Sequence, residues 1–235
     1  MRQIKLPSVP GWDRKTDAKT FDFENYQGMR KLFITGIGTD VGKTVAAAIL
    51  TEALEADYWK PIQSGSITDS DKLTVQSLIS NTKSVFHPEV YSLTQPLSPH
   101  AAAEIDGVEI DLSKIILPIS NNILIIEGAG GLMVPLNYKG DYVIDLIKAL
   151  DAEAILISRH YLGSINHTLL SAEALKNRGI AVAGILFNGA ENVASEKVIL
   201  ETTGLKMLGR IDEEATINRD TILSYKTRFS GIWKS

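Results

Sequence analysis

Gly36-Ile-Gly-Thr-Asp-Val-Gly-Lys-Thr44 lies between an apolar run at 32–35 and a second apolar segment at 45–50. The first run is typical of a buried strand and the second of the start of a helix. Backbone N–H groups in such a turn and at a helix N-terminus favour a bound anion. The strand, the glycine-rich turn and the Gly-Lys-Thr at the helix start therefore predict a phosphate-binding loop and nucleotide binding. An ordinary turn that happens to contain these residues is the alternative.

The residues of this loop are expected to contact the phosphates and the metal ion of a bound nucleotide. Lys43 can reach the β- and γ-phosphates, and the Thr44 hydroxyl can bind Mg²⁺. Five residues separate Gly36 from Gly42, one more than in the common form of the motif. The remaining nucleotide contacts are expected from the loop residues Gly38, Thr39, Asp40, Val41 and Gly42.

Composition narrows the class of protein. With 235 residues, 44% of them hydrophobic, the chain can bury the core of one large α/β domain. The net charge of −4 and the lack of a basic stripe argue against nucleic acid or a membrane surface as a partner. The chain has no cysteine, which excludes disulfides, thiolate metal sites and cysteine nucleophiles. No apolar run is long enough for a membrane span or a signal peptide, so a cytoplasmic location is expected by default.

Residues 1–28 differ from the rest of the chain. They are polar, are interrupted by Pro7, Pro10 and Gly11, and have no sustained periodicity. The stretch 24–28 resembles a protease-site linker of an expression tag, which is the kind of segment to exclude from fold prediction. The alternative is a natural extension that packs its aromatic residues on the domain. We therefore expect an N-terminal extension at 1–28, either flexible or derived from an expression tag, and a P-loop α/β domain at 29–235.

From residue 32 onward, apolar strands alternate with helical segments. Strands are predicted at 32–35, 58–59, 122–126, 154–158 and 182–187, helices from 43 and at about 70–80, 142–150 and 164–177, and weaker strand and helix signals at 207–223. Continuous apolar strands separated by helices predict a mainly parallel, doubly wound sheet with helices on both faces, in a single P-loop NTPase-like domain. Ligands bind beyond the carboxyl ends of such strands.

Polar residues follow several of these strands. The strand at 58–59 ends in Lys60-Pro-Ile-Gln-Ser-Gly65, the strand at 122–126 in Glu127-Gly-Ala-Gly-Gly131, and the strand at 182–187 in Asn188. The alternatives are that Lys60 is a solvated lysine and that Glu127 is a buried, paired carboxylate. Because strand ends share one edge of a parallel sheet, convergence of these groups predicts a functional site there.

Mg²⁺ binds oxygen ligands, usually one or two carboxylates together with phosphates. Thr44 supplies one oxygen by its motif, and Glu127 follows a second strand. Asp69 and Asp71 precede a predicted helix, where either could instead be an N-cap. Whether Asp69 assists Asp71 at the metal stays open.

Several motifs in order resemble one family, the dethiobiotin synthetases. They are Thr35-Gly-Ile-Gly-Thr-Asp-Val-Gly-Lys-Thr44, Lys60-Pro-Ile-Gln-Ser-Gly65, Ser70-Asp71, Ser98-Pro-His100, Glu127-Gly-Ala-Gly-Gly131, Leu162-Gly-Ser-Ile-Asn-His167 and Asn188, and they cover about 32–211. The resemblance implies that 7,8-diaminononanoate, CO₂ and MgATP give dethiobiotin, ADP and phosphate through a carbamate and a carbamic–phosphoric anhydride. Two positions depart from the family pattern: Asp212 replaces an expected proline, and Asp40 replaces a frequent glutamate.

The resemblance also implies roles for individual residues. Lys43 and Lys60 would supply positive charge for phosphoryl transfer, and Thr39 and Ser64 hydroxyl donors. The metal would be held by Thr44, Asp71 and Glu127, and Asn188 would read the adenine edge. The substrate would contact Ser64, Gly130, Leu162, Gly163 and Asn166. In the family the 162–166 segment comes from the neighbouring subunit, which implies a homodimer with composite active sites.

Two other functions are open on the same scaffold. A partitioning ATPase would carry a signature lysine five positions before the loop lysine, where this chain has Gly38. An amidotransferase-type synthase acting on a corrinoid would need a nucleophilic cysteine and a second domain, and the chain has no cysteine. Both alternatives are therefore disfavoured by the sequence.

Overall fold

A computed structural model describes residues 30–65 and 69–231. Its centre is a six-stranded sheet in the order β2-β5-β1-β6-β7-β8, in which each pairing is parallel. The strands are β1 (Lys31–Gly36), β2 (Asp57–Trp59), β5 (Leu124–Gly131), β6 (Glu153–Arg159), β7 (Val182–Asn188) and β8 (Met207–Ile211). The predicted parallel, doubly wound α/β sheet is confirmed.

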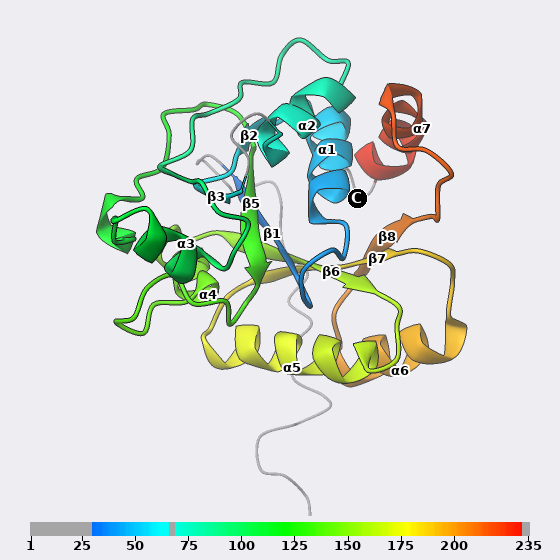
Figure 1. Cartoon of the computed structure of the whole chain (residues 1–235). Helices are drawn as coiled ribbons and strands as arrows, with labels where there is room; N and C mark the ends of the chain where they lie inside the picture. Colours follow the sequence, from blue (N-terminus) through cyan, green and yellow to red (C-terminus); the bar gives the residue numbers. More distant parts are fainter. Residues whose placement is uncertain (1–29, 66–68, 232–235) are drawn as a thin grey trace, which may run out of the picture.

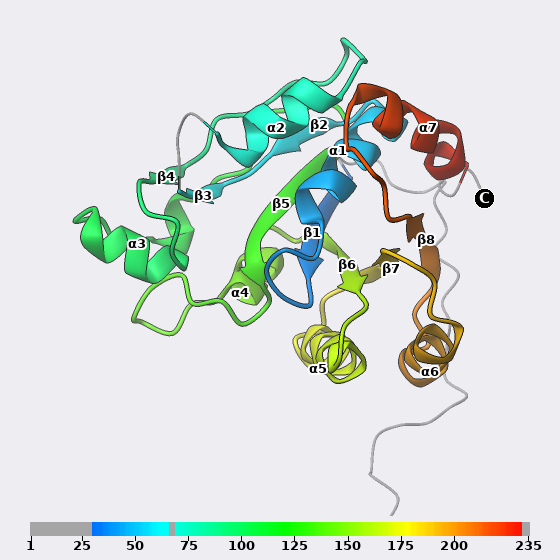
Figure 2. The same ribbon diagram turned by 45° about the vertical axis from the view of Figure 1, so that its right-hand side comes forward.

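Helices cover both faces of this sheet (Figure 1; Figure 2). One face carries α1 (Lys43–Leu54), α2 (Asp71–Leu78) and α7 (Arg219–Ser230). The opposite face carries α4 (Val143–Ala149), α5 (Ser164–Asn177) and α6 (Val193–Thr203). At one edge lies a smaller unit with α3 (Pro99–Ile105) and a two-stranded sheet of β3 (Ile62–Ser64) and β4 (Tyr91–Leu93); the short 3-10 helix η2 (Leu112–Lys114) follows in the chain.

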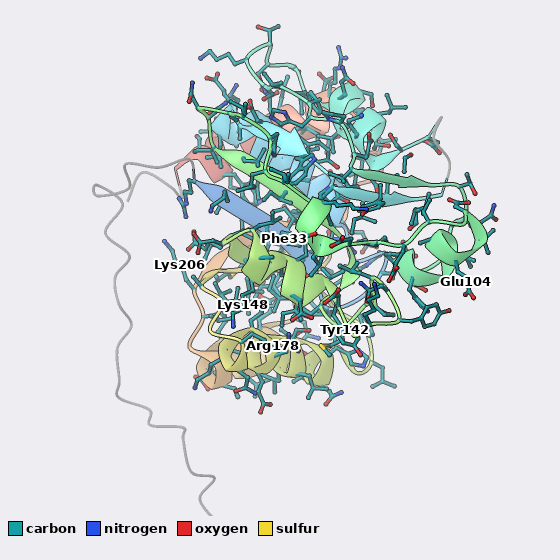
Figure 3. The ribbon with its side chains drawn as sticks, turned by 90° about the vertical axis from the view of Figure 1, so that its left-hand side faces the viewer. Phe33, Glu104, Tyr142, Lys148, Arg178 and Lys206 are labelled. Atoms are coloured by element: carbon teal, nitrogen blue, oxygen red, sulfur yellow. The ribbon has the colours of Figure 1, made fainter. Side chains whose placement is uncertain are left out.

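The packing on the two faces of the sheet follows from the alternation of side chains along each strand. On β1, Leu32 and Ile34 belong to the apolar cluster on the α1 face, whereas Phe33 belongs to the cluster on the α4 face. All three are fully buried, and burial of each stabilises the fold by about 1.5–3 kcal/mol. Figure 3 shows Phe33 beside α4, with Arg178, the residue directly after α5, below it. The side chain of Arg178 forms an ion pair with Asp145 of α4.

Most predicted elements are confirmed, and α5 has the predicted bounds. The prediction that a strand at 122–126 ends at Glu127 is wrong: β5 begins at Leu124 and continues to Gly131, because the glycine-rich segment keeps pairing with β1, where Gly131 pairs with Gly36. The elements α3, α6, β3 and β4 were not predicted. The predicted extension at 1–28 lies outside the described residues.

Within the described ranges, no helix is long and apolar enough to cross a membrane. The carboxyl ends of β1, β2 and β7 lie along the same edge of the sheet as the last residues of β5, because all the strands are parallel. The loop 37–42 connects β1 to α1 at this edge (Figure 2).

Candidate active site

A cavity of about 1010 Å³ opens at this edge of the sheet. It brings together eleven residues predicted for the site: Thr39, Asp40, Gly42, Lys43, Thr44, Lys60, Ser64, Asp71, Glu127, Gly130 and Asn188. Its walls come from the phosphate loop, from β3, from the start of α2 and from the ends of β5 and β7. The structure therefore brings the residues that follow the predicted strands together in one cavity.

The phosphate loop touches the end of β7. Gly42 is the N-cap of α1 and has φ +93°, a left-handed backbone that favours glycine. A Cβ atom at this position would lie 2.3 Å from Nδ2 of Asn188. That amide donates a hydrogen bond of 2.8 Å to the carbonyl oxygen of Val41. Asn188 thus fixes the loop, and Val41 points its side chain into the core instead of lining the cavity.

Two further contacts shape the loop. The Nζ atom of Lys43 donates to the carbonyl oxygen of Gly38 at 3.0 Å, so the lysine folds back over the loop. Burial lowers the pKa of Lys43, and the nearby cation Lys60 lowers it further, against the attraction of Glu127. Asp40 has φ +56°, a conformation in which aspartate is enriched among non-glycine residues. Gly38 lines a second cavity of about 300 Å³ between the loop and α5.

Three oxygen-bearing side chains meet at the base of the cavity. The Oγ1 atom of Thr44 lies 3.0 Å from Oδ1 of Asp71 and 2.8 Å from Oε1 of Glu127. One hydroxyl proton can serve only one of these carboxylate oxygens at a time. The arrangement therefore offers a hard oxygen donor set, which suits Mg²⁺. Among residues 30–65 and 69–231, no group of three or more His, Cys, Asp or Glu side chains could hold a metal ion. Mg²⁺ is usually held by one or two carboxylates together with phosphate and water oxygens.

Lys60 joins the two carboxylates. Its side chain is buried, lies 3.2 Å from Oε1 of Glu127, and forms a second ion pair with Asp71. Burial alone would lower the pKa of Lys60, but Glu127 and Asp71 together raise it above the ordinary value. Burial would likewise raise the pKa of Asp71, yet Lys60 and Thr44 lower it. The solvated-lysine alternative for Lys60 is wrong, whereas Glu127 is indeed a buried, paired carboxylate at 1% exposure.

The start of α2 shows which residue is its N-cap. Ser70 is the N-cap, and its Oγ accepts a hydrogen bond of 3.3 Å from the backbone N–H of Leu73. Asp71 is the first residue of the helix, and its side chain points to Thr44 and Lys60. Asp69 is exposed. The N-cap alternative is therefore wrong for both aspartates.

The remaining predicted residues fall into two groups. Ser64 and Gly130 line the cavity, and the Oγ of Ser64 is buried with no hydrogen-bond partner among the described residues. Leu162, Gly163 and Asn166 lie outside it, at the exposed start of α5. Within one chain, the structure does not bring these three residues to the phosphate loop.

The structure adds residues that were not predicted from the sequence. The Oη atom of Tyr58 donates to Oε2 of Glu127 at 2.8 Å, and Oε1 of Gln63 accepts from the backbone N–H of Asp71 at 3.3 Å. Burial and then Glu127 raise the pKa of Tyr58 well above its ordinary value. The same cavity is also lined by Arg159, Gly189, Ile211, Asp212, Glu213, Glu214 and Ile217. Gln63 lies within the quoted Lys60–Gly65 motif, which was a usable signal.

The chain matches one family model and is similar to several proteins of known name. A family model described as "AAA domain" matches residues 30–221. The ATP-dependent dethiobiotin synthetase BioD of Cytophaga hutchinsonii is 52% identical over 87% of this chain and 99% of that protein. The protein of the same name from Christiangramia forsetii is 52% identical over 85% of this chain and 96% of its own length.

Solved structures resemble the chain in fold. The cell division ATPase MinD of Pyrococcus furiosus has a TM-score of 0.58 at 16% identity and covers 88% of this chain and 98% of its own. A putative plasmid partition protein of Borrelia burgdorferi, bound to AMPPNP, has a TM-score of 0.55 at 13% identity, over 88% of this chain and 99% of its own. At these identities the likeness shows the P-loop NTPase-like fold alone.

Proposed function

The chain belongs to the ATP-dependent dethiobiotin synthetase family, which makes it an ATP-dependent enzyme of the ligase class, and we propose how its own residues perform the reaction. The overall reaction converts 7,8-diaminononanoate, CO₂ and MgATP to dethiobiotin, ADP and phosphate. The observation that supports it best is the shared cavity, in which two buried lysines face an oxygen cluster at the phosphate loop.

The proposed chemistry has three bond-forming steps. One amine of the substrate attacks CO₂ and loses a proton, which gives a carbamate. A carbamate oxygen then attacks the γ-phosphorus of ATP, ADP leaves, and a carbamic–phosphoric anhydride forms. The second amine attacks the carbonyl carbon and loses a proton, phosphate leaves, and the cyclic urea closes. No covalent bond to the protein is needed, which suits a chain without cysteine.

Charge is the main contribution of the protein to these steps. An anionic carbamate has to approach an anionic phosphate, and catalysis of such transfers is mostly positioning and electrostatic stabilisation. Lys60 is held cationic between two carboxylates, and Lys43 can turn from the Gly38 carbonyl to a phosphate oxygen. Thr39 and Ser64 are hydroxyl donors at the rim and wall of the same cavity.

Thr44, Asp71 and Glu127 would hold Mg²⁺, because Oγ1 of Thr44 lies 3.0 Å from Oδ1 of Asp71 and 2.8 Å from Oε1 of Glu127. Bound there, the ion would neutralise charge on the phosphates. The base of ATP would lie at the end of the cavity near Asn188, and backbone groups of the loop would bind the phosphates.

We propose a homodimer with composite sites for the same reaction. Leu162 is fully exposed just before α5, and Met133 and Leu170, which both line the smaller cavity beside α5, are each more than half exposed. Exposed apolar side chains of this kind favour a protein partner. Backbone N–H groups at the start of α5 would bind the distal carboxylate of a substrate whose amines lie at the partner's lysines.

One assay tests the reaction. ATP consumption should require both the diamine and bicarbonate, and dethiobiotin should form in equal amount with ADP. A partitioning ATPase would instead hydrolyse ATP without the diamine, and Gly38 stands where its signature lysine would be. Diamine-independent turnover at the full rate would contradict the proposal.

A second assay tests the composite site. Lys43→Ala damages the phosphate loop and Gly163→Trp blocks the start of α5, so each variant alone should be inactive. In a mixed dimer with composite sites, one site carries both defects and the other carries neither. Refolding the two variants together should therefore restore dethiobiotin formation. A mixture that stays inactive, although mixed dimers are confirmed, would show that each site lies within one chain.

A further inference from the structure

We propose that Tyr58 is a positioning residue that holds the carboxylate of Glu127 in the orientation that Mg²⁺ requires. The inference rests on the proposed metal role of Glu127. The evidence is that the two oxygen atoms of the Glu127 carboxylate have different hydrogen-bond partners.

The two oxygens of Glu127 face different surroundings. Oε1 lies 2.8 Å from Oγ1 of Thr44 and 3.2 Å from Nζ of Lys60, on the side of the cavity. Oε2 accepts a hydrogen bond of 2.8 Å from Oη of Tyr58, which is its one partner within the described part of the chain. Tyr58 therefore determines which oxygen is left for the cavity.

The sheet explains how Tyr58 reaches this position. In the parallel pairing of β2 with β5, Tyr58 is opposite Ile125, two residues before Glu127. Side chains two residues apart lie on one face of a sheet. Both side chains therefore lie on the α1 face, where the ring of Tyr58 packs 5.6 Å from that of Phe86. With no exposed surface, Tyr58 has its ring held by packing.

Removing the hydroxyl would free the carboxylate. Glu127 is 1% exposed, so water has little access to replace the lost donor at Oε2. The group could then turn toward Thr44 and Lys60 with either oxygen. Partners that orient a metal ligand typically change metal affinity by about 10–100-fold when they are removed.

The test is Tyr58→Phe, which keeps the ring and removes only the hydroxyl. ADP binding is measured by calorimetry at increasing Mg²⁺ concentrations. We expect the Mg²⁺ concentration at half of the maximal effect to rise by about tenfold or more in the variant. ADP binding in EDTA should stay at the wild-type value, because the phosphate loop is unchanged. The matched control is Tyr138→Phe, which removes a Tyr–Glu hydrogen bond of 2.7 Å between exposed side chains; its acceptor, Glu104, lies on α3 (Figure 3).

A double-mutant cycle makes the test specific. In a Glu127→Gln background, Tyr58→Phe should change the Mg²⁺ requirement by less than about twofold, because coupled residues give non-additive effects. An unchanged Mg²⁺ requirement in Tyr58→Phe, additive effects in the double variant, or equal weakening of ADP binding with and without Mg²⁺ would each overturn the inference. If wild-type ADP binding does not respond to Mg²⁺, the proposed metal role of Glu127 fails instead.

Discussion

Lys60→Gln is the variant for which the structure gives the clearest expectation. The side chain of Lys60 is 6% exposed and forms ion pairs with Asp71 and Glu127. Removal of one partner from a buried ion pair typically costs about 3–5 kcal/mol, because the remaining charge is left uncompensated. The side chain of Asp71 is 34% exposed, so water can solvate part of its charge. We therefore expect a loss of about 3 kcal/mol in the free energy of unfolding, the lower end of that range.

Urea unfolding at pH 7 in EDTA measures this loss. The matched control is Lys139→Gln, since Lys139 pairs with Glu109 at 2.7 Å but both side chains are more than half exposed. We expect no measurable loss for the control, because exposed pairs contribute little. Addition of Mg²⁺ and ADP should reduce the loss in Lys60→Gln, since the cation compensates the same two carboxylates. Equal losses in the two variants would refute the assignment of Lys60 as the buried counter-ion.

The same variant separates binding from chemistry. Lys60→Gln should lose dethiobiotin formation and keep ADP binding, because the phosphate loop residues are untouched. A parallel loss of ADP affinity would instead assign Lys60 to nucleotide binding.

Three further predictions follow from individual contacts. Lys43→Ala should lower turnover on the order of a hundredfold to a thousandfold with the fold intact, as expected when a group that stabilises developing charge is removed; wild-type-like activity would contradict the loop assignment. Glu127→Gln and Asp71→Asn should raise the Mg²⁺ requirement of the reaction more than Asp69→Asn does, and a Mg²⁺ titration in which Asp69→Asn is the most damaging would reverse the metal assignment. For Glu52, burial would raise the pKa, but the Ser80 and Asn81 amides and Lys226 lower it below 4.5. Its stabilising contribution is therefore present above the unfolded-state pKa and is lost as the pH falls through the lowered folded-state pKa. The unfolding free energies of wild type and Glu52→Gln, measured by urea unfolding, should therefore converge as the pH falls below 4.5.

Local signals in the sequence predicted the phosphate loop and the sheet. The loop is recognisable because its residues are contiguous in the sequence. The strands β1, β6 and β7 are recognisable because a strand buried on both faces is a continuous apolar run. Lys60 and Glu127 were predicted at one edge because parallel strands share that edge, whereas Asp71 was predicted from the start of a helix and from the family resemblance. For Glu127 the edge is correct although the strand continues past it.

The missing pieces have physical causes. Only Glu196 and Ile199 are buried on α6, so the helix has no apolar stripe to reveal it in the sequence. The strands β3 and β4 have three residues each, too few for a periodic signal. The hydrogen bond between Tyr58 and Glu127 joins residues far apart in the chain and depends on the register of β2 with β5, which no local pattern contains.

The pairing of β1 with β5 has a consequence for synthesis of the chain. Lys31 pairs with Leu124 and Gly36 with Gly131, so β1 is synthesised well before β5, the strand with which it pairs. At 5–20 residues per second, roughly 5–20 s separate the synthesis of Lys31 and Leu124 on the ribosome. During this interval the apolar side chains of β1 lack their partner strand, and the loop that follows has no sheet to support it. The phosphate loop therefore gains the support of β5 only after residue 131 has been synthesised.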